Sequence, residues 1–491
     1  MSYVSIAFNI IAGLIYTPWM VNMIGKSDYG LFVLVTSFLS YFLIDFGIGQ
    51  AIARFISKYR TEGDEARVSQ LLGLTMKLYL LFDLIIFITL VVIFLFIENI
   101  FIELSSVELS RFKVAFIIAG FFSVFSFPFM SLNGILIAYE RFVILKFSDL
   151  LKKVSLIFFM IIALFLGYKL YALVAVNAMV GILIIFFKLF YLSKIPSIKI
   201  NARFYSKKLL KEIFSFSAWV TMIGIAQRLL LSITPAILGI FSGTTQIAIF
   251  AIGMTIEGYT WTFANALNGL FLPKVTKLAT NNQNLDEVTN LMIKVGRIQL
   301  FLVGLLLIGF VTLGNQFIFF WMGEDFKESY FVAVLLIVPG VISLTQQIGN
   351  TLLFVEDKLK YKALLLLGAS LISVFISILL SPEYGAIGSS VGIFTGLLLS
   401  NVIGINIIFS KVLKLNIFRF FRETHLQMML PLVLSLIVGF LIQIYIPAYS
   451  LLFFFLKVIL LGSVYLVLMW MMALNESEKK LIRSFSKKIK F

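Results

Sequence analysis

Five ionisable side chains lie inside apolar stretches of this sequence, namely Asp45, Asp83, Arg228, Glu257 and Lys457. A carboxylate in such a place can carry a proton or a cation, and a guanidinium can bind an anion through two parallel hydrogen bonds. The first four lie near the middle of their stretches, so they cannot easily reach a membrane surface, whereas Lys457 is closer to one end. We therefore treat the first four as candidate functional residues.

Polar residues accompany two of these charges at helical spacing. One series runs through residues 213–240 and consists of Ser217, Thr221, Gly224, Arg228, Ser232 and Pro235. A second runs through 244–271 and consists of Glu257, Trp261, Asn265 and Asn268. A weaker series near the start contains Asn9 at the position that corresponds to Gln227 or Arg228. Intervals of three or four place each series on one helix face, although small polar residues also serve helix packing.

Composition identifies the surroundings of these residues. The chain has 491 residues, of which 61% are hydrophobic and 13% charged, and its mean hydropathy is +1.05. That leaves too little polar surface to cover a soluble globule, so we expect an integral membrane protein. With no cysteine and one histidine, the chain offers no disulfide, thiolate site or histidine cluster, and no metal site is predicted.

Fourteen stretches are long and apolar enough to cross a bilayer as helices. If the N-terminus is cytoplasmic, 33 of the 40 Lys and Arg residues fall in inside loops and the tail, against five in outside loops. This asymmetry predicts that both termini are cytoplasmic. It also explains the net charge of +16 by membrane topology and contact with anionic lipid headgroups, and not by binding to nucleic acid.

The sequence also predicts an internal repeat. Thr17-Pro18 recurs as Thr234-Pro235, and LNGILIAYERF (132–142) resembles IGNTLLFVEDKL (348–359), at nearly the same offset along the chain. We therefore expect an all-α polytopic protein with two six-helix lobes in a parallel repeat plus two C-terminal helices. The predicted parts are the lobes 1–192 and 213–410, the basic segments 193–212 and 411–424, the helix pair 425–474 and the basic tail 475–491.

Two halves around a shared cavity are typical of transporters that work by alternating access. The DFG at 45–47 lacks the other kinase motifs, and no Walker A motif is present, so uphill transport would need an ion gradient, the membrane potential or consumption of product. The outside loops are short, which disfavours a membrane enzyme such as a glycan polymerase. We expect no enzyme activity and no cofactor, with H⁺ or Na⁺ as the alternatives for a coupling ion.

The block IGKSDYGLFVLVTSFLSYFLIDFGIGQAIARFISKYRTEGD (24–64), together with LNGILIAYERF and a basic loop before the seventh span, resembles a known family. It is similar to the polysaccharide-transporter branch of the multidrug/oligosaccharidyl-lipid/polysaccharide exporter superfamily, the O-antigen and capsule repeat-unit flippases. The resemblance covers essentially the whole chain. It implies a central cavity lined chiefly by spans 1, 2, 7 and 8, in a bacterial or archaeal plasma membrane.

The same resemblance implies the cargo, an oligosaccharide on a polyprenyl diphosphate carrier, and roles for the candidate residues. Membrane lipids and other polysaccharide-assembly membrane proteins would be partners. The implied cavity residues are Arg228 for the diphosphate, Trp261, Asn265 and Asn268 for sugars, and Asn9, Asp45 and Glu257 beside them. The implied coupling residues are Asp45, Asp83 and Glu257. A related ion-coupled drug exporter and a flippase of peptidoglycan precursor stay as alternatives, as does a purely structural Arg228–Glu257 pair.

Overall fold

The structure is a computed structural model, and it describes residues 2–195, 200–265, 275, 278, 285–447, 450–480 and 483. The regular secondary structure in these residues is helical, and no strand occurs among them. The predicted all-α class is therefore confirmed. The chain forms two compact units, which are described separately below. Unit 1 comprises Met1–Ile6, Ile252–Leu365 and Ser390–Phe491, and unit 2 comprises Ala7–Ala251 and Leu366–Ser389.

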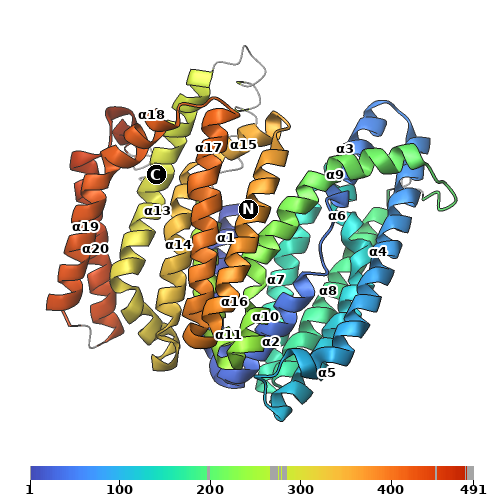
Figure 1. Cartoon of the computed structure of the whole chain (residues 1–491), viewed down its shortest axis with the longest axis horizontal. Helices are drawn as coiled ribbons and strands as arrows, with labels where there is room; N and C mark the ends of the chain where they lie inside the picture. The colour runs from blue at the N-terminus through green and yellow to red at the C-terminus, as the bar shows by residue number, and fades with distance from the viewer. Residues whose placement is uncertain are drawn as a thin grey trace. The chain divides into compact units, whose positions relative to one another are not determined.

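Unit 2 contains most of the first half of the chain (Figure 1). Its helices are α1 (Ser2–Ile24) from Ala7 on, α2 (Lys26–Ser40), α3 (Ile48–Thr61), α4 (Glu65–Ile100), α5 (Ser106–Ser126), the 3₁₀ turn η1 (Phe127–Met130), α6 (Ser131–Ala138), α7 (Phe142–Phe165), α8 (Leu170–Ser193), α9 (Lys207–Gln227), the π-helix η2 (Arg228–Ser232), α10 (Thr234–Phe241), the start of α11 (Gly243–Asn265) and the middle of α16 (Leu359–Leu397). Within this unit α3 packs against α6 and α4, and α5 packs against α2, α4 and α8.

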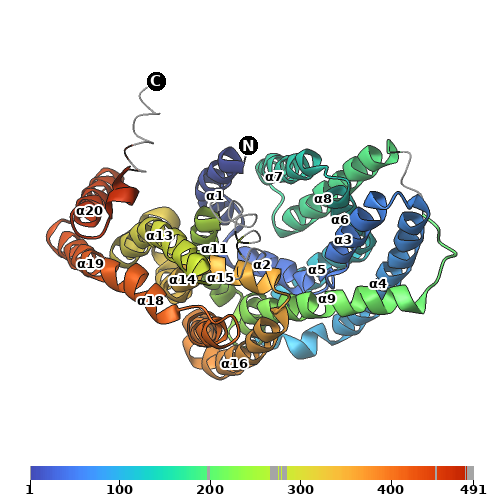
Figure 2. The ribbon, with the colours of Figure 1, turned by 90° about the horizontal axis from the view of Figure 1, so that it is seen from above.

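Unit 1 contains the rest of α11 and most of the second half of the chain. Its elements are α13 (Leu285–Met322), the 3₁₀ turn η4 (Glu324–Phe326), α14 (Ser329–Thr345), α15 (Gln347–Val355), both ends of α16 (Leu359–Leu397), the π-helices η5 (Leu398–Gly404) and η6 (Arg422–Leu426), α17 (Ile405–Lys411), α18 (Ile417–Phe421), α19 (Gln427–Tyr445) and α20 (Leu451–Met472). Figure 2 shows α13, α19 and α20 next to one another, as their contacts require. One part of its core surrounds the buried side chains of Met292, Leu352, Phe409 and Phe420.

Eight helices in the described part of the chain are long and apolar enough to cross a membrane, or nine if the bent pair Lys207–Ser215 and Ser217–Ser232 forms one span. The multi-pass architecture is therefore confirmed, whereas the count of fourteen is not. Several other predicted spans lie on shorter or more charged helices. The helix α7, for example, carries Lys146, Asp149, Lys152 and Lys153. The predicted lobe boundaries stay a prediction.

The local structure repeats at the interval that the sequence predicts. Glu140 and Asp357 both have left-handed backbones, with φ of 56° and 55°, each directly after a helix that ends in the same hydrogen-bond pattern. Such a residue ordinarily is glycine, because a side chain at positive φ is strained. Asn133 and Asn350, which are separated by the same offset, each accept a hydrogen bond from a lysine Nζ at 2.8 Å. The two segments therefore share backbone geometry as well as sequence.

Candidate functional site

The second predicted span, 29–56, is interrupted where a continuous helix was expected. The helix α2 ends at Ser40 and α3 begins at Ile48, and the residues between them are not helical. Phe46 and Gly47 have φ values of 49° and 66°, which reverse the local backbone and prevent a helix from continuing. Peptide groups in such a segment lose their helical partners, so other parts of the protein must satisfy them within a membrane. We call residues 41–47 the α2–α3 break.

Arg228 satisfies two carbonyl groups at this break. It lies at the start of the π-helix η2, and it is half-buried. Its Nε donates to the carbonyl oxygen of Ser40 at 2.9 Å, and its Nη2 donates to that of Leu43 at 2.8 Å. One edge of the guanidinium is therefore bound to backbone carbonyls, the last of α2 and one inside the break, which are partners that we did not predict. An anion could use that edge only after both hydrogen bonds had broken.

Two further contacts join the α2–α3 break to α9 and η2. The Ser217 hydroxyl donates to the Gly47 carbonyl at 3.2 Å, and the Tyr41 hydroxyl donates to the Ser232 carbonyl. A Cβ on Gly47 would lie 3.2 Å from that of Ser217, so a glycine here permits the close approach. Ser217 and Arg228 thus contact the break through their side chains, and Ser232 contacts it through its carbonyl group.

Asp45 lies inside the break, and its side chain binds the first turn of the next helix. Its Oδ2 accepts the backbone N–H of Gly49 at 2.8 Å, in the first turn of α3, and its Oδ1 accepts the hydroxyl of Tyr79 on α4. A carboxylate at a helix N-terminus is favoured by the free N–H groups and by the helix dipole. Tyr79 is completely buried, and we did not predict its role. A tyrosine hydroxyl in an apolar span requires a partner, which is the signal that could have identified it.

Asp83 lies one helical turn beyond Tyr79 on α4. Its Oδ1 is buried without a hydrogen-bond partner in the described part of the chain. Phe82, beside it, stacks on Phe46 of the break at a centroid distance of 4.5 Å. The structure therefore places Asp45, in contact with Tyr79, and Asp83, one turn beyond Tyr79, in the same part of unit 2. An ionised carboxylate without a partner is costly in such a place.

Glu257 and Trp261 belong to the part of α11 that lies in unit 1. Glu257 is buried, and Trp261, one turn later, donates a hydrogen bond to its carboxylate. The indole Nε1 of Trp261 lies next to Gly340 of α14, where an added Cβ would be 3.4 Å from it. The N–H edge of the indole therefore lies beside both Glu257 and α14.

The remaining candidates are less fully described. Asn9 lies in α1 and Asn265 ends α11, but their side chains are outside the described residues, and so is the whole of Asn268. Lys457 is buried in α20 with 1% of its surface exposed, and its Nζ donates to Gln316 of α13 at 3.2 Å. Within unit 1, the Lys457 side chain is therefore held between α20 and α13.

Arg297 of α13 forms a buried ion pair. Its guanidinium binds Glu478 at 2.6 and 2.9 Å, and it also donates to the Glu423 carbonyl, to Oε1 of Gln427 and to the Ala473 carbonyl. All five of its N–H groups are thereby used. The residues that follow α20 are attached to α13 by this pair. Arg297 and Glu478 are 181 residues apart in the chain, so a search for oppositely charged residues at helical spacing does not find this ion pair.

The fold is similar to those of solved flippases and transporters of membranes. One similar solved structure is that of the lipid II flippase MurJ in an inward closed conformation, with a TM-score of 0.68 and 15% identity over 95% of this chain and 97% of that one. An inward-facing multidrug resistance MATE family transporter of the MOP superfamily has a TM-score of 0.65 and 16% identity over 80% of this chain and 92% of its own. A MOP superfamily transporter from Pyrococcus furiosus has a TM-score of 0.55 and 16% identity over 82% and 92%.

The sequence itself gives the family. Residues 1–276 match the family model described as "Polysaccharide biosynthesis protein", so the chain belongs to that family. None of the curated proteins matches it. The predicted membership is therefore confirmed, together with the fold that flippases and drug exporters of the superfamily share.

Proposed function

We propose that this protein is a flippase. It moves polyprenyl-diphosphate-linked oligosaccharide repeat units from the cytoplasmic to the outer leaflet by alternating access, for a surface polysaccharide such as O-antigen, capsule or exopolysaccharide. The observation that carries the proposal is that a chain of the polysaccharide biosynthesis family has, over nearly its whole length, the fold of a lipid II flippase. Both termini would be cytoplasmic, in a bacterial or archaeal plasma membrane, with other assembly proteins beside it.

A lipid-linked glycan needs a hydrated path for its head and an apolar path for its chain. In the proposed path Trp261 stacks on a sugar face, Asn265 and Asn268 bond sugar hydroxyls, and Asn9 lies beside them. Arg228 pairs with the diphosphate, which requires that it exchange the Ser40 and Leu43 carbonyls for phosphate oxygens. We infer that cargo binding and opening of the α2–α3 break are coupled through this exchange.

Coupling to H⁺ or Na⁺ would use the carboxyl groups within the membrane. Asp83 is the strongest candidate for that role, because its Oδ1 is buried without a partner in the described residues. Asp45 already accepts two hydrogen bonds, and Glu257 accepts one from Trp261. A proton or a cation at Asp83 would remove the cost of its unpaired charge.

Deletion of the gene tests the function. Cells that lack the protein should accumulate lipid-linked repeat units on the inner leaflet and lose the surface glycan, because later assembly steps act outside. The complemented strain is the control. If the deletion changed drug tolerance and left the surface glycan intact, the drug-exporter alternative, which the MATE-like fold also fits, would replace this proposal.

Reconstitution tests the coupling. In proteoliposomes with a labelled lipid-linked oligosaccharide, an imposed ion gradient should accelerate flipping by the native protein. The variant Asp83→Asn should flip at the same rate with and without the gradient. Retention of the gradient effect in this variant would exclude Asp83 as the coupling group.

A further inference from the structure

A carboxylate of α5 binds equivalent positions of the two repeat halves. Ser27 and Thr244 are 217 residues apart, which is the offset of the predicted repeat. The Ser27 hydroxyl and the Thr244 hydroxyl each donate to Oε1 of Glu108 at 2.6 Å, and the two hydroxyl oxygens are 3.1 Å apart. All three residues belong to unit 2. We call Ser27, Glu108 and Thr244 the outer cluster, because the proposed topology places them at the outer surface.

The backbones of the two halves approach each other closely at the outer cluster. A Cβ on Gly30 of α2 would lie 2.1 Å from the carbonyl oxygen of Thr244, so only glycine allows α2 this close to the start of α11. Gly25, directly before α2, and Gly243, at the start of α11, have φ values of 89° and 79°. Each half therefore has a left-handed glycine just before the residue that contributes its hydroxyl group.

Within the outer cluster, Glu108 is held by the first half. Its Oε2 accepts the backbone N–H and the hydroxyl of Ser105 at 3.0 and 2.9 Å, at the start of α5. One turn later, Arg111 of α5 forms an ion pair with the buried Asp28 of α2 at 2.8 Å. The attachment of α5 to α2 thus does not depend on Thr244. The contacts of Thr244 are the ones in the outer cluster that cross between the halves.

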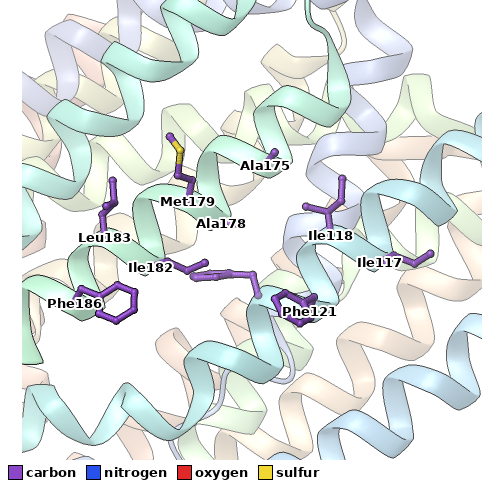
Figure 3. A pocket seen from close by; sticks show the side chains of 10 residues that line it. Ile117, Ile118, Phe121, Ala175, Ala178, Met179, Ile182, Leu183 and Phe186 are labelled. Carbon is purple, nitrogen blue, oxygen red and sulfur yellow. The ribbon is translucent and has the colours of Figure 1, made fainter.

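The rest of α5 is attached to the first half by apolar packing. Figure 3 shows Ile117, Ile118 and Phe121 of α5 and the side chains of α8 around an apolar groove of about 580 Å³. Beside this groove the two helices are in contact, and a Cβ on Gly181 of α8 would overlap the ring of Phe122. Close packing on a small residue holds helices together in a membrane, so α5 moves with the first half.

The turn that carries Thr244 is held by the second half. The Ser242 hydroxyl donates to the Ser381 carbonyl at 2.8 Å, and Oε1 of Gln246 accepts the Ala386 N–H at 2.9 Å. Ser381 and Ala386 lie in the middle of α16, which the sequence assigns to the second half. The outer cluster thus lies between two groups of elements, α2 with α5 and the α10–α11 turn with α16, each of which is bonded within its own half.

We propose that the outer cluster is a gate, in which Glu108 binds Thr244 and closes the outer side of the protein. The proposal rests on the proposed function, because alternating access requires the outer ends of the halves to separate when cargo leaves. Glu108 is only half-buried, so water can replace the hydroxyl groups at its carboxylate each time the gate opens. A permanent joint between the halves would have the same hydrogen bonds, and two tests separate it from a gate.

The first test is a disulfide across the outer cluster. The chain has no cysteine, so Ser27→Cys with Thr244→Cys introduces one pair of thiols, at side chains whose oxygens are 3.1 Å apart. In proteoliposomes with a labelled lipid-linked oligosaccharide, oxidation of this variant should slow flipping by about tenfold or more, and reduction should restore it. Ser381→Cys with Ser389→Cys is the matched control, because its hydroxyl oxygens are 2.7 Å apart within the second half. Its oxidation should leave flipping unchanged.

The second test is thiol labelling, which needs no cargo. Leu34 of α2 is completely buried, and its side chain lies 3.2 Å from where a Cβ on Gly239 of α10 would be. This position therefore meets water only when the halves separate. Leu34→Cys should react about fivefold faster with an impermeant reagent from outside when Thr244→Val removes the hydroxyl that binds Glu108. Thr245→Val, at the adjacent exposed position, is the matched control and should leave the rate unchanged.

The outcomes distinguish the gate from the proposed function. If the oxidised Ser27→Cys, Thr244→Cys variant flips glycan at the native rate, the outer cluster is a permanent joint and the gate is excluded, although the protein is a flippase. Equal labelling of Leu34→Cys with Thr244→Val and with Thr245→Val would also exclude the gate, and it decides the question if the thiol pair does not oxidise. If labelling responds as expected but the native protein flips no glycan, the gate stands and the proposed cargo is wrong.

Discussion

Replacement of Arg228 by methionine should destabilise unit 2. The change removes two hydrogen bonds from a charged donor, of 2.9 and 2.8 Å, each of which contributes about 1.5–3 kcal/mol. Part of this is offset because the half-buried guanidinium no longer has to leave water. We therefore expect a loss of about 3 kcal/mol, near the lower end of the sum. For a unit of this size that corresponds to a fall in the melting temperature of about 6–12 °C.

The assay is thermal unfolding of the purified protein in detergent, followed by intrinsic fluorescence. Gln227→Met is the matched control, because Gln227 is the preceding residue and its side chain is exposed. Arg228→Lys should give an intermediate fall, since one ammonium group cannot reproduce the planar fork. If Arg228→Met and Gln227→Met melted at the same temperature, the two carbonyl bonds would not stabilise the break. A loss of transport alone would then point to cargo binding as the role of Arg228.

A charge exchange, Arg228→Glu with Glu257→Arg, would not separate a structural from a functional Arg228. A glutamate at position 228 offers no N–H group, so it cannot donate to the Ser40 and Leu43 carbonyls. Loss of function in the exchanged protein would therefore follow from damage to the break alone. The stability comparison of Arg228 with Gln227 avoids this difficulty.

Three other predictions concern separate parts of the chain. Arg297→Met should lower the stability of unit 1 by about 3–5 kcal/mol, because Glu478 is left buried without its partner, and Arg297→Met with Glu478→Leu should recover much of it in the same unfolding assay. Gly134→Ala should reduce the yield of folded protein in size-exclusion chromatography, because its Cβ would collide with the backbone of α3. In a chain without cysteine, Ser105→Cys should react with an impermeant thiol reagent from outside and Ile200→Cys should not; the reverse would overturn the topology.

The sequence predicts the membrane class, the helical fold and the repeat, because each depends on local pattern. Apolar length identifies spans, and the constant offset between the two halves identifies turns such as those at Glu140 and Asp357. The α2–α3 break could not be predicted in the same way. YFLIDFG is apolar apart from Asp45, and nothing in its spacing differs from a continuous span. Its interruption depends on contacts with residues of α9 and η2 that are distant in sequence, which override local preference.

The candidate site is predictable only in part, for a related reason. An ionisable side chain stands out in any apolar stretch, which is how Asp45, Asp83, Arg228 and Glu257 were found. The partners of these residues are harder to identify, because two opposite charges in a sequence suggest an ion pair with each other. Arg228 binds backbone carbonyls instead, and every residue carries such a group, so this partner leaves no signal. The hydroxyl of Tyr79, by contrast, is a side-chain group that a search for buried donors would find.

The distance in sequence between the break and Arg228 has a consequence for the order of membrane assembly. Ser40 and Arg228 are separated by 188 residues, and synthesis at about 5–20 residues per second takes about 10–40 s to cover them. During that interval the carbonyl groups of the break cannot remain bare in lipid. The nascent segment must therefore be hydrated, or form a continuous helix, until α9 inserts beside it. If it forms a continuous helix, the interruption of the second span is a late product of biosynthesis, and a ribosome-bound chain that ends before α9 should lack it.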